Sequence, residues 1–175
     1  MASHILLAET TITSSTANVI FDGYLDDTAY KGFQIIFTDV TSDSASASYM
    51  RQLFRDGGSD ITTTDSYNRH FIYSYSYGAG GTAQWVNGEY LEINGTLDNG
   101  GDNFISGDFI MYHTNDSSSE IVGTFRTLNT TPDGNMHFAQ GGVGNTNHQT
   151  MDGMKFYLNG GNFATGNFRL YGIKA

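Results

Sequence analysis

The sequence contains no cysteine, one proline and one tryptophan, and basic residues are scarce. The lack of cysteine excludes disulfide bonds and thiolate metal sites. Because Pro132 is the single proline, turns must be built from glycine, asparagine, aspartate, serine and threonine. Lys and Arg number 8 against 18 Asp and Glu, which gives a formal charge of −10. This acidic balance disfavours nucleic acid and anionic membranes as partners, because phosphate-rich surfaces are bound through Lys and Arg.

Long apolar runs are also missing. No run approaches the roughly 18 residues that a membrane-spanning helix needs. The first residues, MASHILLAETT, have a short apolar patch at 5–8 but neither the basic leader nor the longer apolar stretch of a secretory signal. We interpret the patch as a first strand and expect a soluble protein with no membrane partner.

Strand-forming residues are abundant instead. Segments rich in β-branched and aromatic residues recur about every 8 to 15 residues between turn-forming clusters, a pattern typical of an antiparallel sandwich or barrel. Helical periodicity is nearly absent. The sequence therefore predicts one domain over residues 1–175, an all-β, jelly-roll-like antiparallel sandwich of about ten short strands. The predicted strands span residues 5–8, 18–21, 33–40, 49–54, 69–77, 90–94, 104–112, 121–128, 154–158 and 167–173.

Alternation assigns the core-facing side of three strands, since successive side chains of a strand point to opposite faces. The residues expected to face the core are Phe33, Ile35 and Phe37, then Ile121 and Phe125, then Met154, Phe156 and Leu158. Three polar or glycine-rich stretches are interpreted as loops: 38–48, 129–135 and 141–153. The last, GGVGNTNHQTMDG, is the longest irregular stretch and is expected to be a mobile surface.

The stretch FIYSYSYGAGG, residues 71–81, places Phe71, Tyr73, Tyr75 and Tyr77 on one strand face. Full exposure of all four rings would form an apolar patch near the upper limit for a soluble monomer. Burial of each ring instead contributes roughly 1.5–3 kcal/mol before entropy is counted. We therefore predict that the row is an edge of the core. The opposite face, with His70, Ile72, Ser74 and Ser76, is expected to face solvent or to be lightly packed.

The tyrosine hydroxyls refine that prediction. A buried hydroxyl needs a hydrogen-bond partner, so rings of this kind suit a boundary with a wet rim. Tyr73, Tyr75 and Tyr77 are therefore expected to continue into a subunit interface, and Trp85 could cap the same surface. A platform for stacking glycan rings is the alternative interpretation.

Chemistry-bearing residues form no catalytic pattern. The histidines are scattered and lack the spacing of metal sites; they are His4, His70, His113, His137 and His148. No Gly-x-Ser-x-Gly segment supports a serine nucleophile. In LDNGGDNF, residues Asp98, Asn99, Asp102 and Asn103 offer oxygen ligands to calcium, but the spacing fits no complete EF-hand loop. A tight turn between two strands is the favoured interpretation, and no catalytic residue, metal ligand or cofactor is predicted.

The C-terminal stretch GNFATGNFRLYGIKA resembles the ending of a family of small virion structural proteins of tailed, often marine, bacteriophages, whose last strand closes on Leu-Tyr-Gly-Ile. The matching residues are Leu170, Tyr171, Gly172 and Ile173, preceded by Gly166 and Phe168. HILLAETTIT, TANVIF and GFQIIFTDV are similar to the family's beginning, whereas its middle Phe-Asn-Gly-Asp segment and following Tyr are matched only loosely by LFRDGGSD and Tyr67.

The ending also predicts structure by itself. Phe168 and Leu170 project to one face, with Arg169, Tyr171 and Ile173 on the other. Gly172 leaves room for a neighbouring backbone or ring. We expect this last strand to lie inside a sheet.

The resemblance implies a β-sandwich displayed in many copies on a phage particle, made in the host bacterial cytoplasm. Because packaged DNA would repel a charge of −10, the outer capsid surface or the tail is favoured over the capsid lumen. An outer capsid decoration or cement protein, trimeric and bound to the major capsid protein or other virion proteins, is the function expected. A receptor- or glycan-binding module of a tail fibre is the alternative. A depolymerase of cell-surface polysaccharide is a third hypothesis, although the sequence nominates no carboxylate pair for it.

Overall fold

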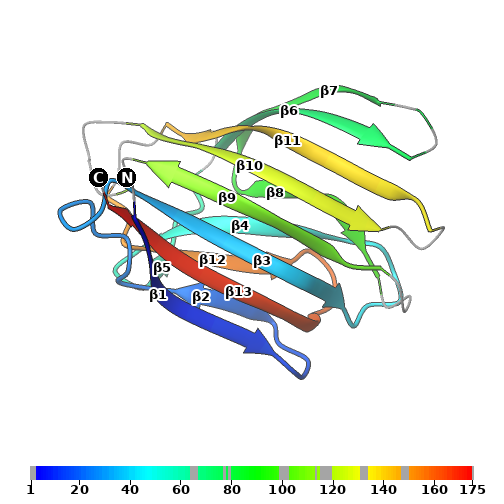
Figure 1. The fold of residues 1–175 in the computed structure, drawn as a ribbon, viewed down its shortest axis with the longest axis horizontal. Helices are drawn as coiled ribbons and strands as arrows, with labels where there is room; N and C mark the ends of the chain where they lie inside the picture. Colours follow the sequence, from blue (N-terminus) through cyan, green and yellow to red (C-terminus); the bar gives the residue numbers. More distant parts are fainter. Residues whose placement is uncertain are drawn as a thin grey trace.

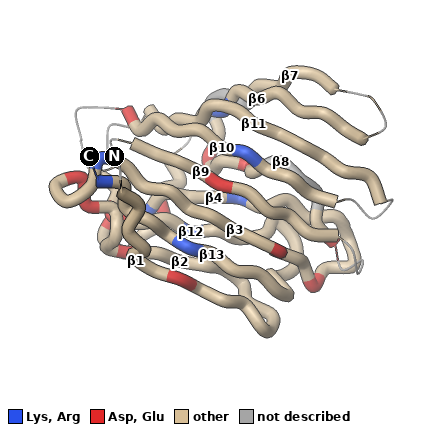
Figure 2. Tube along the Cα trace, viewed as in Figure 1, with Lys and Arg blue, Asp and Glu red and all other residues tan. Residues whose placement is uncertain are grey.

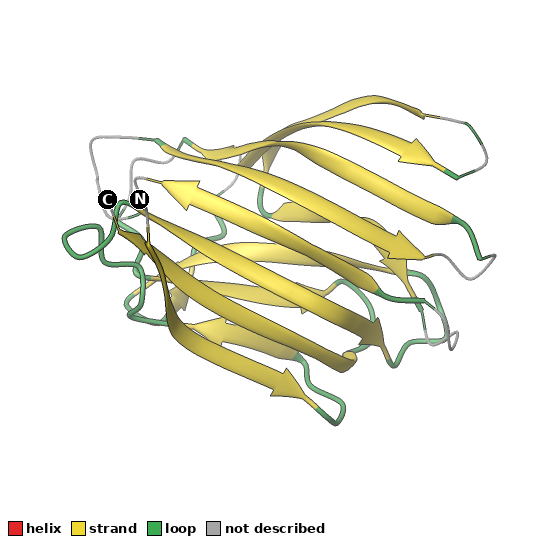
Figure 3. Ribbon diagram, in the orientation of Figure 1, coloured by secondary structure: helices red, strands yellow, loops and turns green. Residues whose placement is uncertain are grey.

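Two antiparallel β-sheets pack face to face in the structure, a computed structural model of the chain (Figure 1). It describes residues 3–63, 67–76, 78, 80–98, 103–112, 114, 120–130, 134–146 and 150–174. Within these ranges every regular element is a strand (Figure 3). The predicted all-β antiparallel sandwich is therefore confirmed.

The larger sheet has eight strands and the smaller has five. The order in the larger sheet is β1 (Ser3–Ile12), β13 (Phe163–Lys174), β3 (Gly32–Ser42), β9 (Ile105–Tyr112), β10 (Ile121–Thr130), β11 (Met136–Asn145), β6 (Tyr67–Tyr75) and β7 (Gly80–Gly88). The smaller sheet runs β2 (Asn18–Phe21), β12 (Gly153–Leu158), β4 (Ser48–Asp56) and β5 (Ser59–Asp60), with β8 (Leu91–Leu97) also paired to β4. The chain passes repeatedly from one sheet to the other, so neighbouring strands are often distant in sequence.

The core lies between the sheets and is rich in aromatic rings. Each core-facing residue predicted from alternation in β3, β10 and β12 is buried. Phe168 of β13 lies at its centre, with ring centroids 5.4 Å from Phe156 of the smaller sheet, 5.5 Å from Phe163 and 6.1 Å from Phe37. Ring packing across the gap therefore joins the two sheets.

The C-terminal strand lies inside the larger sheet, as predicted. β13 pairs with β1 on one side and β3 on the other, and the Ser3–Lys174 pair brings the two ends of the chain together (Figure 1). Phe168 and Leu170 are fully buried. A Cβ atom on Gly172 would lie 2.3 Å from the Tyr30 ring. The room that Gly172 leaves is thus occupied by an aromatic ring.

Three strands were not predicted: β5, β7 and β11. The loop predicted at 141–153 is wrong over 141–145, because these residues complete β11 and pair with both β10 and β6. It is also wrong at Gly153, which begins β12. Glycine is favoured there by close packing, since a Cβ on Gly141 would lie 2.1 Å from the carbonyl oxygen of His70. The predicted loops at 38–48 and 129–135 likewise begin within β3 and β10, respectively, and Ser48 already belongs to β4.

Candidate functional site

The predicted aromatic row lies on β6 and is half-buried. Phe71 and Tyr73 pack against the core, which agrees with a core edge. Ring centroids are 6.0 Å apart between Phe71 and Tyr73 and 5.3 Å apart between Tyr73 and Tyr75. His137 of β11 extends the row, 3.6 Å from Tyr75, and partial burial lowers the pKa of its imidazole. The row is therefore a continuous stack of rings across two strands.

The other predicted members of this surface are less fully described. Tyr77 lies outside the described residues. Trp85 belongs to β7, where its backbone is in register with Arg69, and its side chain is outside the description. On the opposite face of β6, His70, Ile72 and Ser74 are exposed, as the alternation predicted.

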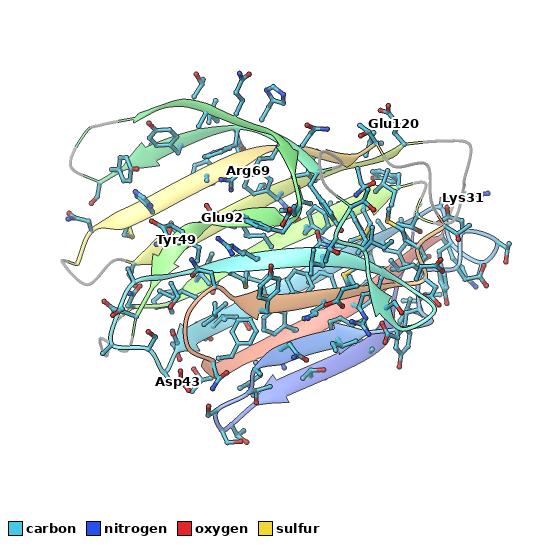
Figure 4. All side chains as sticks on the ribbon, turned by 180° about the vertical axis from the view of Figure 1, so that it is seen from behind. Lys31, Asp43, Tyr49, Arg69, Glu92 and Glu120 are labelled. Atoms are coloured by element: carbon cyan, nitrogen blue, oxygen red, sulfur yellow. The ribbon has the colours of Figure 1, made fainter. Side chains whose placement is uncertain are left out.

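Arg69 anchors the row to the smaller sheet. Its guanidinium lies 4.7 Å from the Phe71 ring centroid, and its Nη2 is 3.3 Å from Oε1 of Glu92 on β8 (Figure 4). Burial lowers the pKa of Arg69, and the adjacent Glu92 carboxylate opposes that shift. Glu92 also lies 3.6 Å from Arg51, whose guanidinium covers the ring of Tyr90. Sequence analysis missed this contact because 23 residues separate Arg69 from Glu92.

A second feature is a groove of about 800 Å³ that lies mainly on the outer face of the larger sheet. Its described polar lining is His70, Thr82, Gln84, Thr124, Arg126 and Gln140, from β6, β7, β10 and β11. Register places Gly142 between Thr124 and His70, and a Cβ there would meet no atom closer than 3.9 Å. Exposed amide, hydroxyl and imidazole groups therefore surround a shallow floor.

Arg126 is held at one side of this groove by Asp108. Its Nε and Nη2 donate to the two carboxylate oxygens of Asp108 at 2.9 and 3.0 Å, and Gln34 donates to the same carboxylate at 3.1 Å. The hydrogen bonds from Arg126 to Asp108 raise the pKa of Arg126. The described lining residues include no Asp or Glu, so the groove lacks the paired acids of a glycoside hydrolase.

An apolar patch adjoins the groove. It consists of Ile72, Leu128, Met136 and Phe138, whose exposed fractions are 48%, 42%, 52% and 37%. Leu128 and Phe138 are directly opposite in the register of β10 and β11. Since large apolar side chains gather here on three neighbouring strands, the patch has the composition of a protein-binding surface.

Charge is distributed unevenly around these features. β6, β7 and β11 contain no acidic residue, although the chain has 18. Their single Lys or Arg is Arg69. We call β6, β7 and β11 the acid-free strands, and Figure 2 shows how few charges they carry. Acidic side chains lie instead on the loops and on other strands of both sheets, so these three strands add no negative charge of their own to this end of the molecule.

Elsewhere, charged side chains pair with one another. Arg55, 8% exposed, donates from Nε to Asp22 at 2.7 Å and also pairs with Asp60. Lys155 reaches Asp60 at 2.5 Å. The hydrogen bonds with Asp22 raise the pKa of Arg55. This network joins the residue after β2 to β4, β5 and β12, and it has the character of a structural brace.

The other sequence candidates remain separate. His4 and His70 are exposed on β1 and β6, whereas His113 and His148 lie outside the described residues. Asn103 donates to Asp98 at 2.9 Å in the connection from β8 to β9, and Asn99 and Asp102 are not described. In the described part of the chain, no three metal-binding side chains are grouped and no helix is long and apolar enough to cross a bilayer.

Compared with known protein families and with curated proteins, the chain matches none. The resemblance to phage virion proteins therefore stays a prediction from the sequence. Three features of the described surface bear on function: the groove, the apolar patch and the acid-free strands.

Proposed function

We propose that the protein is a structural component of a bacteriophage virion that decorates the outside of the capsid and stabilises it. The observation that carries this proposal is the apolar patch of Ile72, Leu128, Met136 and Phe138 beside the acid-free strands. Its partners would be the major capsid protein or other virion proteins and further copies of itself. No nucleic acid or membrane is required.

The charge distribution supports this role. A chain with a net charge of −10 can approach another protein closely only where the local repulsion is small. The patch meets that condition, since it lies on β6, β10 and β11. Burial of apolar side chains would supply the attraction. Binding across capsomer boundaries then stabilises the assembled shell by mass action, by about 2.7 kcal/mol per site at a hundredfold excess over the dissociation constant.

Particles that lack the protein provide the test. Purified protein is added back, and the bound amount and the bursting temperature of the particles are measured. Met136→Asp/Phe138→Asp should lose binding and leave the particles fragile, because it puts charge into the patch. Thr13→Asp/Ser14→Asp adds the same charge at exposed positions after β1 and should bind as the wild type does. Equal binding by both variants, or antibody label confined to the tail, would contradict the proposal.

A glycan-binding module is the second candidate, and the groove favours it. Side-chain amides, hydroxyls and an imidazole face a space of about 800 Å³, which suits the donors and acceptors of a sugar ring. The stacked rings of Tyr73, Tyr75 and His137 offer a separate aromatic surface on the other side of the sheet.

These two sugar sites can be distinguished on a glycan array. Gly142→Leu adds a side chain beside the groove, at a position where a Cβ meets no atom closer than 3.9 Å, so it should weaken binding there. Trp85→Ala instead tests the aromatic surface predicted from the sequence. An array that stays blank with the wild-type protein would exclude this second candidate for the glycans displayed.

A further inference from the structure

We propose that β7 is a self-association edge, where two copies of the chain pair their β7 strands antiparallel about a two-fold axis. β7 is the last strand of the eight-stranded sheet, and no strand among the described residues pairs with its outer edge. Every second residue of an edge strand points its N–H and C=O groups away from the sheet, where another strand can pair with them. The proposal concerns the isolated protein and does not depend on the proposed role in a virion.

The sequence of β7 leaves most of this edge without the usual protection. Natural sheets guard their edges with charged residues, proline or bulges. The nine residues GGTAQWVNG have neither charge nor proline. The pairing of β7 with β6 has a register shift between Trp85 and Gly88, so the unguarded part of β7 is the regular run from Gly80 to Trp85. The opposite edge, β1, has both a register shift between Leu6 and Ala8 and a charged residue, Glu9, in an ion pair with Arg169.

Charge permits a second copy of the chain to occupy the edge. Two molecules of net charge −10 repel one another, and the repulsion is smallest when acid-free strands meet. A two-fold axis through β7 brings together β7 and, one strand further in, β6 of both copies. The next acidic residue after β7 in the sequence is Glu89, which directly follows Gly88. In an antiparallel pair it would lie beyond the end of the partner's strand.

The described side chains of β7 are compatible with extension of the sheet. Thr82 and Gln84 are exposed, and both lie on the outer face of the sheet. A second β7 would extend this face as one continuous sheet. The interface would be isologous, which builds dimers and not the trimer expected from the sequence.

Sedimentation of the purified protein over a range of concentrations tests the proposal. The wild type should be a dimer that dissociates on dilution. Thr82→Glu/Gln84→Glu places like charges opposite one another across the axis and should raise the dissociation constant roughly tenfold or more. Thr13→Glu/Ser14→Glu adds the same charge after the β1 edge and should leave it unchanged. A monomeric wild type, a trimer, or equal effects of both variants would overturn the proposal.

Disulfide cross-linking through engineered cysteines tests the contact between two β7 strands independently of sedimentation. Because the chain has no cysteine, single substitutions from Gly80→Cys to Gly88→Cys can be oxidised without competing disulfides. Residues at the axis lie opposite their own copies, within the Cα separation that a disulfide spans. A covalent dimer should form at one or two neighbouring positions and not at Thr13→Cys. Cross-linking at none of them, with far-ultraviolet spectra unchanged, would also overturn the proposal.

Discussion

Tyr67 offers the sharpest test of the interior. Its side chain is fully buried, its hydroxyl donates to the carbonyl oxygen of Ile61 at 2.9 Å, and it accepts from the N–H of Phe54 at 2.9 Å. Its ring stacks on Phe54 at 6.0 Å with the planes 9° apart. Tyr67→Phe removes the hydroxyl and keeps the ring. Two buried backbone groups then lose a partner, which costs about 1–3 kcal/mol.

Thermal and denaturant unfolding can measure that loss. For a chain of this size each kcal/mol lowers Tm by about 2–4 °C, so a decrease of roughly 2–12 °C is expected. Tyr24→Phe is the matched control: the same hydroxyl is removed from a side chain that is 40% exposed, and stability should change by less than about 0.5 kcal/mol. If Tyr67→Phe proved as stable as the control, the hydroxyl could not be joining the two segments.

Three further predictions concern the stability of the packed sheets. Gln52 is fully buried and its amide has no hydrogen-bond partner among the described residues. Gln52→Met should therefore increase the free energy of unfolding by about 1–2 kcal/mol, measured as a higher denaturation midpoint. Gly141→Ala forces a Cβ against the backbone of β6 and should destabilise by about 1–3 kcal/mol, whereas Gly142→Ala, with open space at its Cβ, should be nearly neutral in the same assay. Burial raises the pKa of Tyr67 above its usual value of 10.0, so this side chain favours the folded state below about pH 10 and loses that effect as the pH rises further. The free energy of unfolding, measured from pH 8 upward, should therefore fall steeply at alkaline pH, and Tyr67→Phe should make that fall shallower. An equally steep fall in Tyr67→Phe would contradict the role given to the Tyr67 hydroxyl.

The sheet class and several faces could be predicted from the sequence because the signals are local. In β3 and β12 every second residue in the middle of the strand is a large apolar side chain that is buried, and that period is a property of the strand itself. β11 was missed because Gly141, Gly142 and Gly144 resemble a turn in sequence. At Gly141 the glycine instead allows neighbouring strands to approach closely, a condition visible only once β6 and β10 are in place.

The candidate sites were harder to predict because each depends on how neighbouring strands align, which brings together residues that are distant in sequence. The groove combines residues from β6, β7, β10 and β11, and its arrangement depends on which residue of each strand faces which. The aromatic row was visible as four alternating residues, yet His137, which extends it, comes from a strand that had been interpreted partly as loop. The acid-free strands could have been noticed from the absence of Asp and Glu in residues 67–88 and 134–151. Only the sheet order shows that these two stretches are neighbours.

Strand spacing explains why this segregation of charge would matter for binding. Neighbouring strands lie about 4.8 Å apart, so Asp108 on β9 is four strands, or roughly 19 Å, from the β7 edge. That is about two Debye lengths at physiological ionic strength, so the Asp108 carboxylate adds little repulsion across a contact at β7. Glu89, directly after the end of β7, is nearer to this edge along the chain. The carboxylate of Asp108, if placed on β6, would lie one strand, about 4.8 Å, from the β7 edge, which is within one Debye length. The larger sheet thus keeps its acidic residues far enough from one edge for that edge to pair, while the rest of the surface keeps the protein strongly negative.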